Sequence, residues 1–143
     1  MSDWKLEPTD PFSRNLKWYA KKRPRELQAV LDNLDTFHEA LNAGALPQQV
    51  RVGFIHPEPQ GILAVDQKGG GANLQQTRLY MFPWVPTKTI YLLALGDKRS
   101  QSDDIRLCRQ TVDELLLGLS KLPEDHDQSS LPQRDGDDQG PGE

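Results

Sequence analysis

The sequence predicts an α+β fold in which an N-terminal helical hairpin packs on a small antiparallel sheet and a C-terminal helix closes the domain. Three observations lead to this prediction. Apolar residues recur at helical steps in the first third of the chain, the middle changes to strand-like patterns, and a last helical stretch follows. Because the strands are grouped and joined by short connections, we expect an antiparallel meander rather than a parallel sheet.

The N-terminal region is expected to contain an arm and a first helix. Residues 1–9 have no convincing period, so we expect a short arm there. A helix over about 11–22 follows, because Asp10 suits the N-cap and Pro11 suits the first helical position.

A second helix begins at Pro24, because proline is not accommodated inside a continuous helix. It ends at 42–44, where Gly44 can adopt the left-handed conformation that closes many helices. One face of this helix is apolar at three- and four-residue steps and is expected to face the core. Its members are Leu27, Val30, Leu31, Leu34, Phe37 and Leu41.

The strands are expected between residues 50 and 95. In 77–82 (TRLYMF), Leu79 and Met81 fall on one face of the strand and Arg78, Tyr80 and Phe82 on the other. The prolines of 83–86 predict a turn, since proline cannot donate to a ladder. The other expected strands are 50–55 (VRVGFI), 61–67 (GILAVDQ) and 89–95 (TIYLLAL), the last being the most apolar.

A third helix starts near Ser102, with Ser100 or Ser102 as its cap, and stops by Pro123. Its expected buried stripe is Ile105, Cys108, Val112, Leu115, Leu116 and Leu119. We therefore divide the chain into an arm over 1–9, one domain over 10–122, and an acidic tail over 123–143.

The net charge of −4 over 143 residues divides unevenly along the chain. The tail holds seven acids and one base, whereas the other 122 residues carry a net charge of +2. A tail so charged and so poor in apolar residues is expected to be disordered. The remaining domain is slightly basic, which permits contact with RNA.

Composition also excludes several classes of protein. One cysteine rules out a disulfide framework, and three scattered histidines make no metal-ligand spacing, so no metal or other cofactor is expected. No apolar run approaches the ~20 residues that span a bilayer, and the first residues lack the pattern of a secretory signal. We expect a soluble cytoplasmic protein with no membrane partner.

The most informative motif lies at 92–105 (LLALGDKRSQSDDI). An apolar strand is followed by Gly-Asp-Lys, two variable residues, Gln, and an Asp-Ile pair that opens the last helix. The matching residues are Gly96, Asp97, Lys98, Gln101, Asp104 and Ile105. This pattern resembles the closing strand and turn of the RelE/ParE toxin superfamily, especially the HigB-like addiction-module killer proteins.

The resemblance implies a RelE/ParE-like fold and the toxin component of a type II toxin–antitoxin system, with a cognate antitoxin protein as partner. Many members cut mRNA on the ribosome without a metal. The reaction needs cations to neutralise the charge that develops on the phosphate. By position in the family pattern, Arg78 and Lys98 correspond to these cations, and Arg99 is a neighbouring candidate.

The identity of the general base stays open. His56, Tyr80 and Tyr91 are residues that can accept a proton, and no motif selects among them.

A basic stretch at 14–25 (RNLKWYAKKRPR) contains no acid and has Trp18 and Tyr19 among its cations. Cations and aromatic rings together suit phosphate contact and base stacking, although an ordinary solvated helix face has the same composition. The candidate RNA-binding residues are Arg14, Lys17, Lys21, Lys22, Arg25 and, in the glycine-rich hairpin loop, Lys68.

Structural alternatives accompany these assignments. Arg78 can equally be an exposed cross-strand partner of an acid such as Asp66, and Gly96-Asp97-Lys98 can be a tight turn into a capped helix. The apolar strand 62–65 favours a second function, a non-catalytic protein-interaction module on the same fold. The third possible function is a gyrase-directed poison, as in other members of the superfamily.

Overall fold

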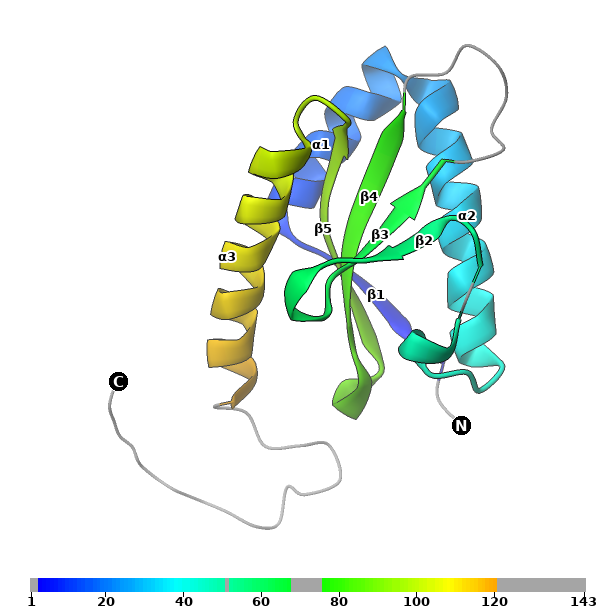
Figure 1. The fold of residues 1–143 in the computed structure, drawn as a ribbon, viewed down its shortest axis with the longest axis vertical. Helices are drawn as coiled ribbons and strands as arrows, with labels where there is room; N and C mark the ends of the chain where they lie inside the picture. The colour runs from blue at the N-terminus through cyan, green and yellow to red at the C-terminus, as the bar shows by residue number, and fades with distance from the viewer. Residues whose placement is uncertain (1–2, 51, 68–75, 121–143) are drawn as a thin grey trace.

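The computed structural model describes residues 3–50, 52–67 and 76–120 (Figure 1). The helices are α1 (Asp10–Lys22), α2 (Pro24–Asn42) and α3 (Gln101–Ser120). The strands are β1 (Lys5–Pro8), β2 (Ile55–Pro57), β3 (Leu63–Asp66), β4 (Thr77–Trp84) and β5 (Thr89–Asp97). Short 3-10 turns lie at η1 (Pro47–Gln49), η2 (Pro59–Gly61) and η3 (Val85–Thr87). The α+β class and the positions of all three expected helices are confirmed.

The sheet has the order β1-β5-β4-β3-β2, and it is mixed. β2, β3, β4 and β5 pair antiparallel as expected, but β1 pairs parallel with β5, Lys5 opposite Thr89. The expectation of a purely antiparallel meander is therefore wrong, and the segment expected to be an arm contains an edge strand. All four residues of β1 are exposed, so no alternation of apolar and polar residues marks this strand in the sequence.

Helices cover both faces of the sheet, α1 and α2 on one and α3 on the other (Figure 1). Leu79 and Met81 of β4 pack with the α1–α2 side, whereas Tyr80 and Phe82 pack with the α3 side. The predicted alternation of β4 is thus confirmed. Strand β5 has a β-bulge at Leu93. Ala94 pairs with Tyr80 and Leu92 pairs with Met81, so Leu93 has no partner in β4.

All four predicted strands differ from their predicted bounds, β3 and β5 by two residues or fewer at an end, and prolines bear on the differences in β2 and β4. β2 lies at Ile55–Pro57 rather than at 50–55. It is an edge strand, so the missing N–H of Pro57 removes no hydrogen bond between inner strands. β4 continues through Pro83 to Trp84, in place of the predicted turn. β3 pairs with β4 only as far as Met81, so β4 has one neighbour at Pro83 and tolerates a residue without an N–H group.

Helix α1 covers the edge of β5 beyond the end of β1. The Thr9 hydroxyl donates to the carbonyl oxygen of Leu92 at 2.9 Å, and Asn15 Oδ1 accepts the N–H of Leu95 at 3.0 Å. These bonds satisfy backbone groups that an uncovered edge would expose. They also bring α1 beside the turn that joins β5 to α3.

Within the described ranges, no helix is both long enough and apolar enough to cross a membrane.

Candidate functional site

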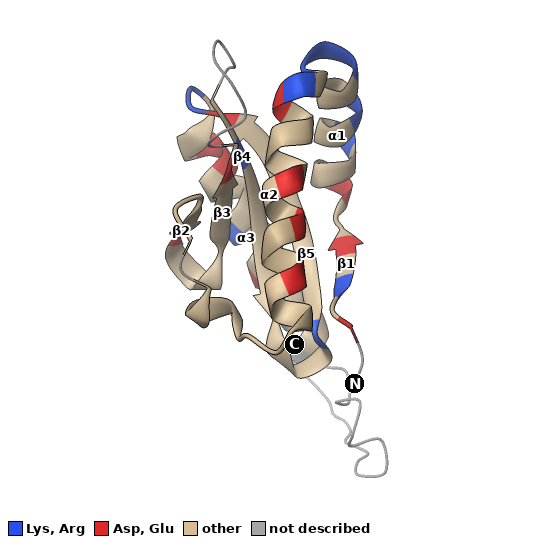
Figure 2. Cartoon of the chain, turned by 90° about the vertical axis from the view of Figure 1, so that its right-hand side faces the viewer, with Lys and Arg blue, Asp and Glu red and all other residues tan. Residues whose placement is uncertain are grey.

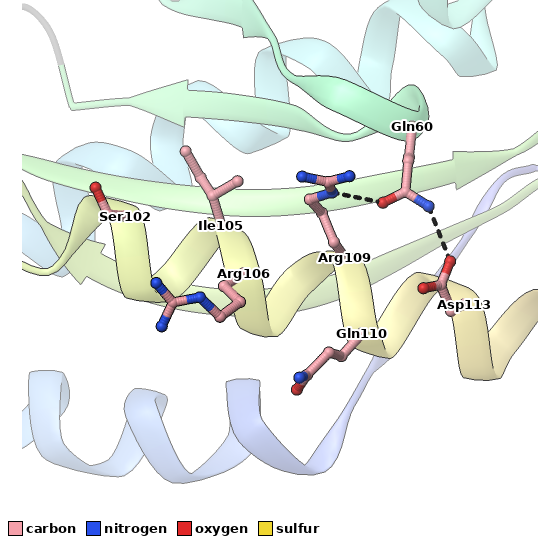
Figure 3. Close-up of a pocket in the computed structure, with 7 residues that line it drawn as sticks. All are labelled: Gln60, Ser102, Ile105, Arg106, Arg109, Gln110 and Asp113. Atoms are coloured by element: carbon pink, nitrogen blue, oxygen red, sulfur yellow. Dashed lines mark hydrogen bonds between the residues drawn. The ribbon is translucent and has the colours of Figure 1, made fainter.

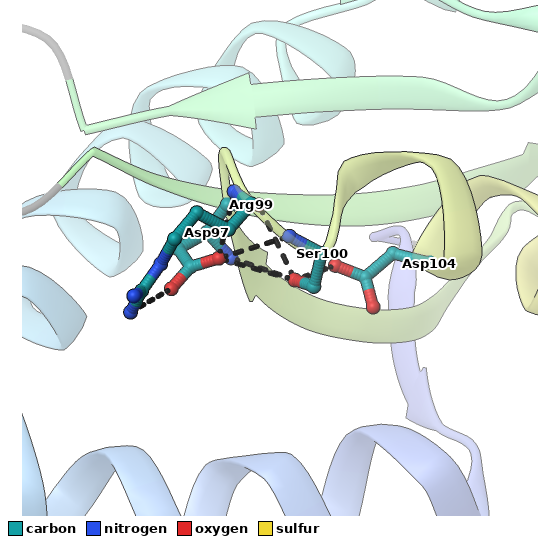
Figure 4. A network of polar contacts seen from close by, with 4 residues as sticks. All are labelled: Asp97, Arg99, Ser100 and Asp104. Carbon is teal, nitrogen blue, oxygen red and sulfur yellow. Dashed lines mark hydrogen bonds and ion pairs between the residues drawn. The ribbon is translucent and has the colours of Figure 1, made fainter.

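The turn between β5 and α3 is held by a polar network (Figure 4). Asp97 Oδ1 accepts the N–H groups of Arg99 at 3.0 Å and Ser100 at 3.1 Å. The Ser100 hydroxyl donates to Asp104 Oδ2 at 2.6 Å and lies 3.2 Å from the N–H of Asp97. Ser100 directly precedes α3, as expected of a cap, but its hydroxyl joins Asp97 to Asp104. The network fixes the turn that carries Lys98 and Arg99.

Gly96 is required beneath this network, because a Cβ there would overlap the Asp104 carboxylate and lie 2.9 Å from the Ser100 hydroxyl. Burial raises the pKa of Asp104. Burial acts in the same direction on Asp97, but the N–H groups of Ser100 and Arg99 outweigh it, so the pKa of Asp97 is lowered. Asp97 is therefore the carboxylate of the pair that stays ionised most readily.

A pocket of about 280 Å³ lies between α1 and this turn. Its walls are formed by Asn15, Trp18 and Tyr19 of α1 and by Leu95, Gly96, Asp97, Ser100 and Asp104. Trp18 is 49% exposed, and the Arg23 guanidinium lies 5.8 Å from the centre of its ring. Burial and the nearby Asp97 charge raise the pKa of Tyr19 to about 12, so its hydroxyl stays protonated. We call this cavity the β5–α3 pocket.

The two elements that form the walls of the β5–α3 pocket also carry exposed cations. All five predicted basic residues at 14–25 are exposed, and Figure 2 shows the cations gathered at the end of α1 and the turn into α2. Lys98 is exposed, and Arg99 is 82% exposed despite a 3.6 Å ion pair with Asp97. Since Trp18 and Asp97 line one pocket, α1 and the Lys98–Arg99 turn are neighbours. Lys68 lies outside the described residues.

Arg78 is held by two carboxylates. Its Nε lies 2.9 Å from Asp66 Oδ1, a short ion pair rather than an aligned hydrogen bond, and its Nη1 lies 3.8 Å from Glu58. Asp66 is its cross-strand partner in the β3–β4 register, as the structural alternative predicts, but the expectation that Arg78 is exposed is wrong. The Arg78 side chain is only 17% exposed, so a phosphate would have to displace Asp66 to reach it.

The three candidate bases occupy different environments. His56 Nε2 lies 2.7 Å from Asp66 Oδ2, and the His56 side chain is 38% exposed. Tyr80 is fully buried, and burial followed by the Asp104 charge raises the pKa of its hydroxyl. Tyr91 is partly buried, which also raises its pKa. His56 Nε2 is therefore engaged by Asp66, and Tyr80 is inaccessible to a substrate.

The structure brings some of the predicted residues together and separates others. Asp66 joins His56 to Arg78 on the α3 face of the sheet, and Arg78 lies beside Gly96 in the β4–β5 register. The backbones of β2 and β5 are three strand spacings apart, about 14 Å. His56 and the Lys98–Arg99 turn are therefore not positioned to contact one phosphate.

We expect Tyr80→Phe to raise the free energy of unfolding by about 1 kcal/mol. Among the described residues the buried Tyr80 hydroxyl has no hydrogen-bond partner, and an unsatisfied buried group costs roughly 1–3 kcal/mol. Urea unfolding of both proteins measures the change, with the partly exposed Tyr91→Phe as a control expected to be near neutral. A clear loss of stability in Tyr80→Phe would show that the hydroxyl is engaged.

A second groove, of about 380 Å³, lies between η2 and the outer face of α3 (Figure 3). Arg109 Nε donates to Gln60 Oε1 at 2.9 Å, and Gln60 Nε2 donates to Asp113 at 2.8 Å. Gln60 has a φ of 63°, so this loop is held against α3 in a conformation unusual for a residue with a side chain. These bonds fasten η2 to α3 and give the groove a structural role.

In the part of the chain that the structure describes, no group of His, Cys, Asp and Glu residues is arranged to hold a metal ion. Cys108 lies on the buried face of α3, and burial raises the pKa of its thiol to about 12. The thiol is therefore uncharged and unreactive.

Comparison of the chain with protein-family models, with curated proteins and with solved structures finds no match.

Sequence reasoning missed the β5–α3 pocket. Trp18 was read with the basic stretch and Asp97 with the turn motif, and neither pattern shows that α1 packs against the end of β5. The contact that joins them, from the N–H of Leu95 to Asn15 Oδ1, has no signature in the sequence.

Proposed function

We propose that this protein is an RNA-directed toxin of the RelE/ParE kind, which binds RNA across the β5–α3 pocket. One observation carries the proposal: the two elements that form the walls of a single cavity, α1 and the β5–α3 turn, both carry exposed cations. The affinity of such a surface for RNA grows with the number of phosphates that its cations neutralise. The order of helical pair, grouped strands and closing helix agrees with the fold that the resemblance implies.

The exposed cations also determine how cleavage would proceed. In this proposal the RNA 2′-oxygen attacks the adjacent phosphorus while its proton passes to water, and the P–O5′ bond breaks to give a 2′,3′-cyclic phosphate. The leaving 5′-oxygen takes a proton from water, and Lys98 and Arg99 neutralise the charge that develops on the phosphate oxygens. Arg78 joins them only when Asp66 and Glu58 release it. RNA binding is therefore better supported by the geometry than the cleavage step.

The test is expression of the full chain and of a Lys98→Ala, Arg99→Ala double variant, with growth, transcript integrity and RNA affinity measured. We expect the parent to slow growth. We expect the variant to bind RNA more weakly, with a slope of log affinity against log salt concentration that corresponds to about two fewer phosphate contacts. The matched control is Lys5→Ala with Arg106→Ala, which removes the same charge from β1 and outer α3. It should behave as the parent.

The outcomes separate the candidate functions. A parent protein that neither slows growth nor binds RNA would overturn the proposal. DNA damage with intact transcripts would identify a gyrase-directed poison.

A second function, the non-catalytic protein-interaction module, is favoured by the neutralisation of Arg78 by Asp66 and Glu58. It predicts stable binding to a protein partner with intact transcripts. It is contradicted if purified parent protein cleaves RNA.

A further inference from the structure

The interior of the β5–α3 pocket differs in charge from its surroundings. The described residues that line it include the carboxylates of Asp97 and Asp104 and the hydroxyl of Ser100, and none is Lys or Arg. The cations lie outside, on the exposed face of α1 and at Lys98 and Arg99. A ligand that fits this arrangement is anionic at its backbone and carries hydrogen-bond donors on the part that enters the pocket.

The carboxylates have the capacity to accept further hydrogen bonds. Asp97 Oδ1 is used by the turn, but Oδ2 faces the largely exposed Arg99 at 3.6 Å, an ion pair that water weakens. Asp104 accepts a bond from Ser100, and an ionised carboxylate has about four acceptor positions. Donors entering the pocket can therefore bind without breaking the turn.

The remaining wall supplies a stacking surface. Trp18 is a large apolar side chain left half exposed where α1 meets the turn. Stacking of an unpaired base on an aromatic ring contributes about 1–3 kcal/mol. The Arg23 guanidinium over the same ring places a positive charge beside the site.

We propose that the β5–α3 pocket holds one unpaired base of a bound RNA, and that it prefers guanine to uracil. Guanine presents two adjacent donors on its Watson–Crick edge, which suit a carboxylate acceptor. Uracil presents one donor between two carbonyl oxygens, which would face the negative charge of Asp97. The cavity of about 280 Å³ is slightly smaller than the roughly 300 Å³ at which drug-sized ligand sites begin, as expected for a single base. This inference rests on the proposed RNA binding and adds base selectivity to it.

The experiment measures the affinity of the full chain for two short single-stranded oligoribonucleotides that differ only in a central guanine or uracil. The parent is expected to bind the guanine oligonucleotide about tenfold more tightly. Trp18→Ala should weaken both affinities, because stacking is lost for either base. Asp97→Asn, which keeps an oxygen for the turn, should abolish the preference. Asp103→Asn is the matched control, since it removes the same charge from a side chain that is 80% exposed outside the pocket.

The possible failures are distinguishable. Tight binding of both oligonucleotides with equal affinity would overturn the base pocket and leave the RNA-binding proposal intact. Absence of binding to either would overturn both. If both oligonucleotides bind equally and free arginine displaces them, the base pocket is overturned. The pocket would then be a binding site for a cationic side chain of a partner protein.

Discussion

Asp66→Ala is expected to lower the free energy of unfolding by about 3 kcal/mol. The Asp66 side chain is 7% exposed and pairs with His56 at 2.7 Å and Arg78 at 2.9 Å. Its removal leaves the largely buried Arg78 facing the more distant carboxylate of Glu58. Removing one partner of a buried ion pair costs roughly 3–5 kcal/mol, and the partial exposure of Arg78 and His56 places this case at the lower end. Urea unfolding measures the change.

Glu58→Ala is the matched control, because it removes a carboxylate from the same arginine at 3.8 Å. Because this contact is longer than the 2.9 Å contact of Asp66, we expect Glu58→Ala to cost clearly less than Asp66→Ala. Equal losses in the two variants would contradict the central role of Asp66.

This stability effect changes how Arg78 is tested as a catalytic residue. Arg78→Ala leaves Asp66 buried without its cation, so it is expected to lose both stability and toxicity. Asp66→Ala shares the loss of stability but keeps Arg78. A toxin that depends on Arg78 for chemistry should therefore keep activity in Asp66→Ala, measured below its unfolding temperature, and lose it in Arg78→Ala.

Local patterns predicted the helices and the faces of β4 because these depend on neighbours in sequence. The helical period of α2 and the alternation of Leu79 with Tyr80 are set by backbone geometry alone. The parallel pairing of β1 depends instead on β5, more than 80 residues later, and its four exposed residues carry no apolar signal. Long-range pairing of an exposed edge strand could not be predicted from the local pattern.

The candidate site was predicted in part for the same reason. The motif placed Lys98 and Arg99 in a turn, and their exposure depends only on the ends of β5 and α3. The strand pattern predicts Asp66 as an alternative partner of Arg78, but the burial of Asp66 and its bond to His56 depend on how β2, β3 and β4 align. The meeting of Trp18 with Asp97 requires the packing of α1 on β5, which no spacing encodes.

Gly96→Ala is expected to lower the free energy of unfolding by about 2 kcal/mol. The added methyl group would overlap the Asp104 carboxylate, so Asp104 must turn away and lose its bond from Ser100. Overpacking of a closely packed site costs roughly 1–3 kcal/mol. Thermal or urea unfolding measures the loss.

Gly118→Ala is the matched control, because a Cβ at this α3 position meets no heavy atom within 4 Å. It should raise the free energy of unfolding by about 0.5–1 kcal/mol, since alanine is the better helix former. Combining Gly96→Ala with Asp104→Ala removes the overlapping carboxylate, so the double variant should lose less than the sum of the two single variants. Strict additivity would show that Gly96 and Asp104 are independent, and the wall of the β5–α3 pocket would then not depend on their close approach.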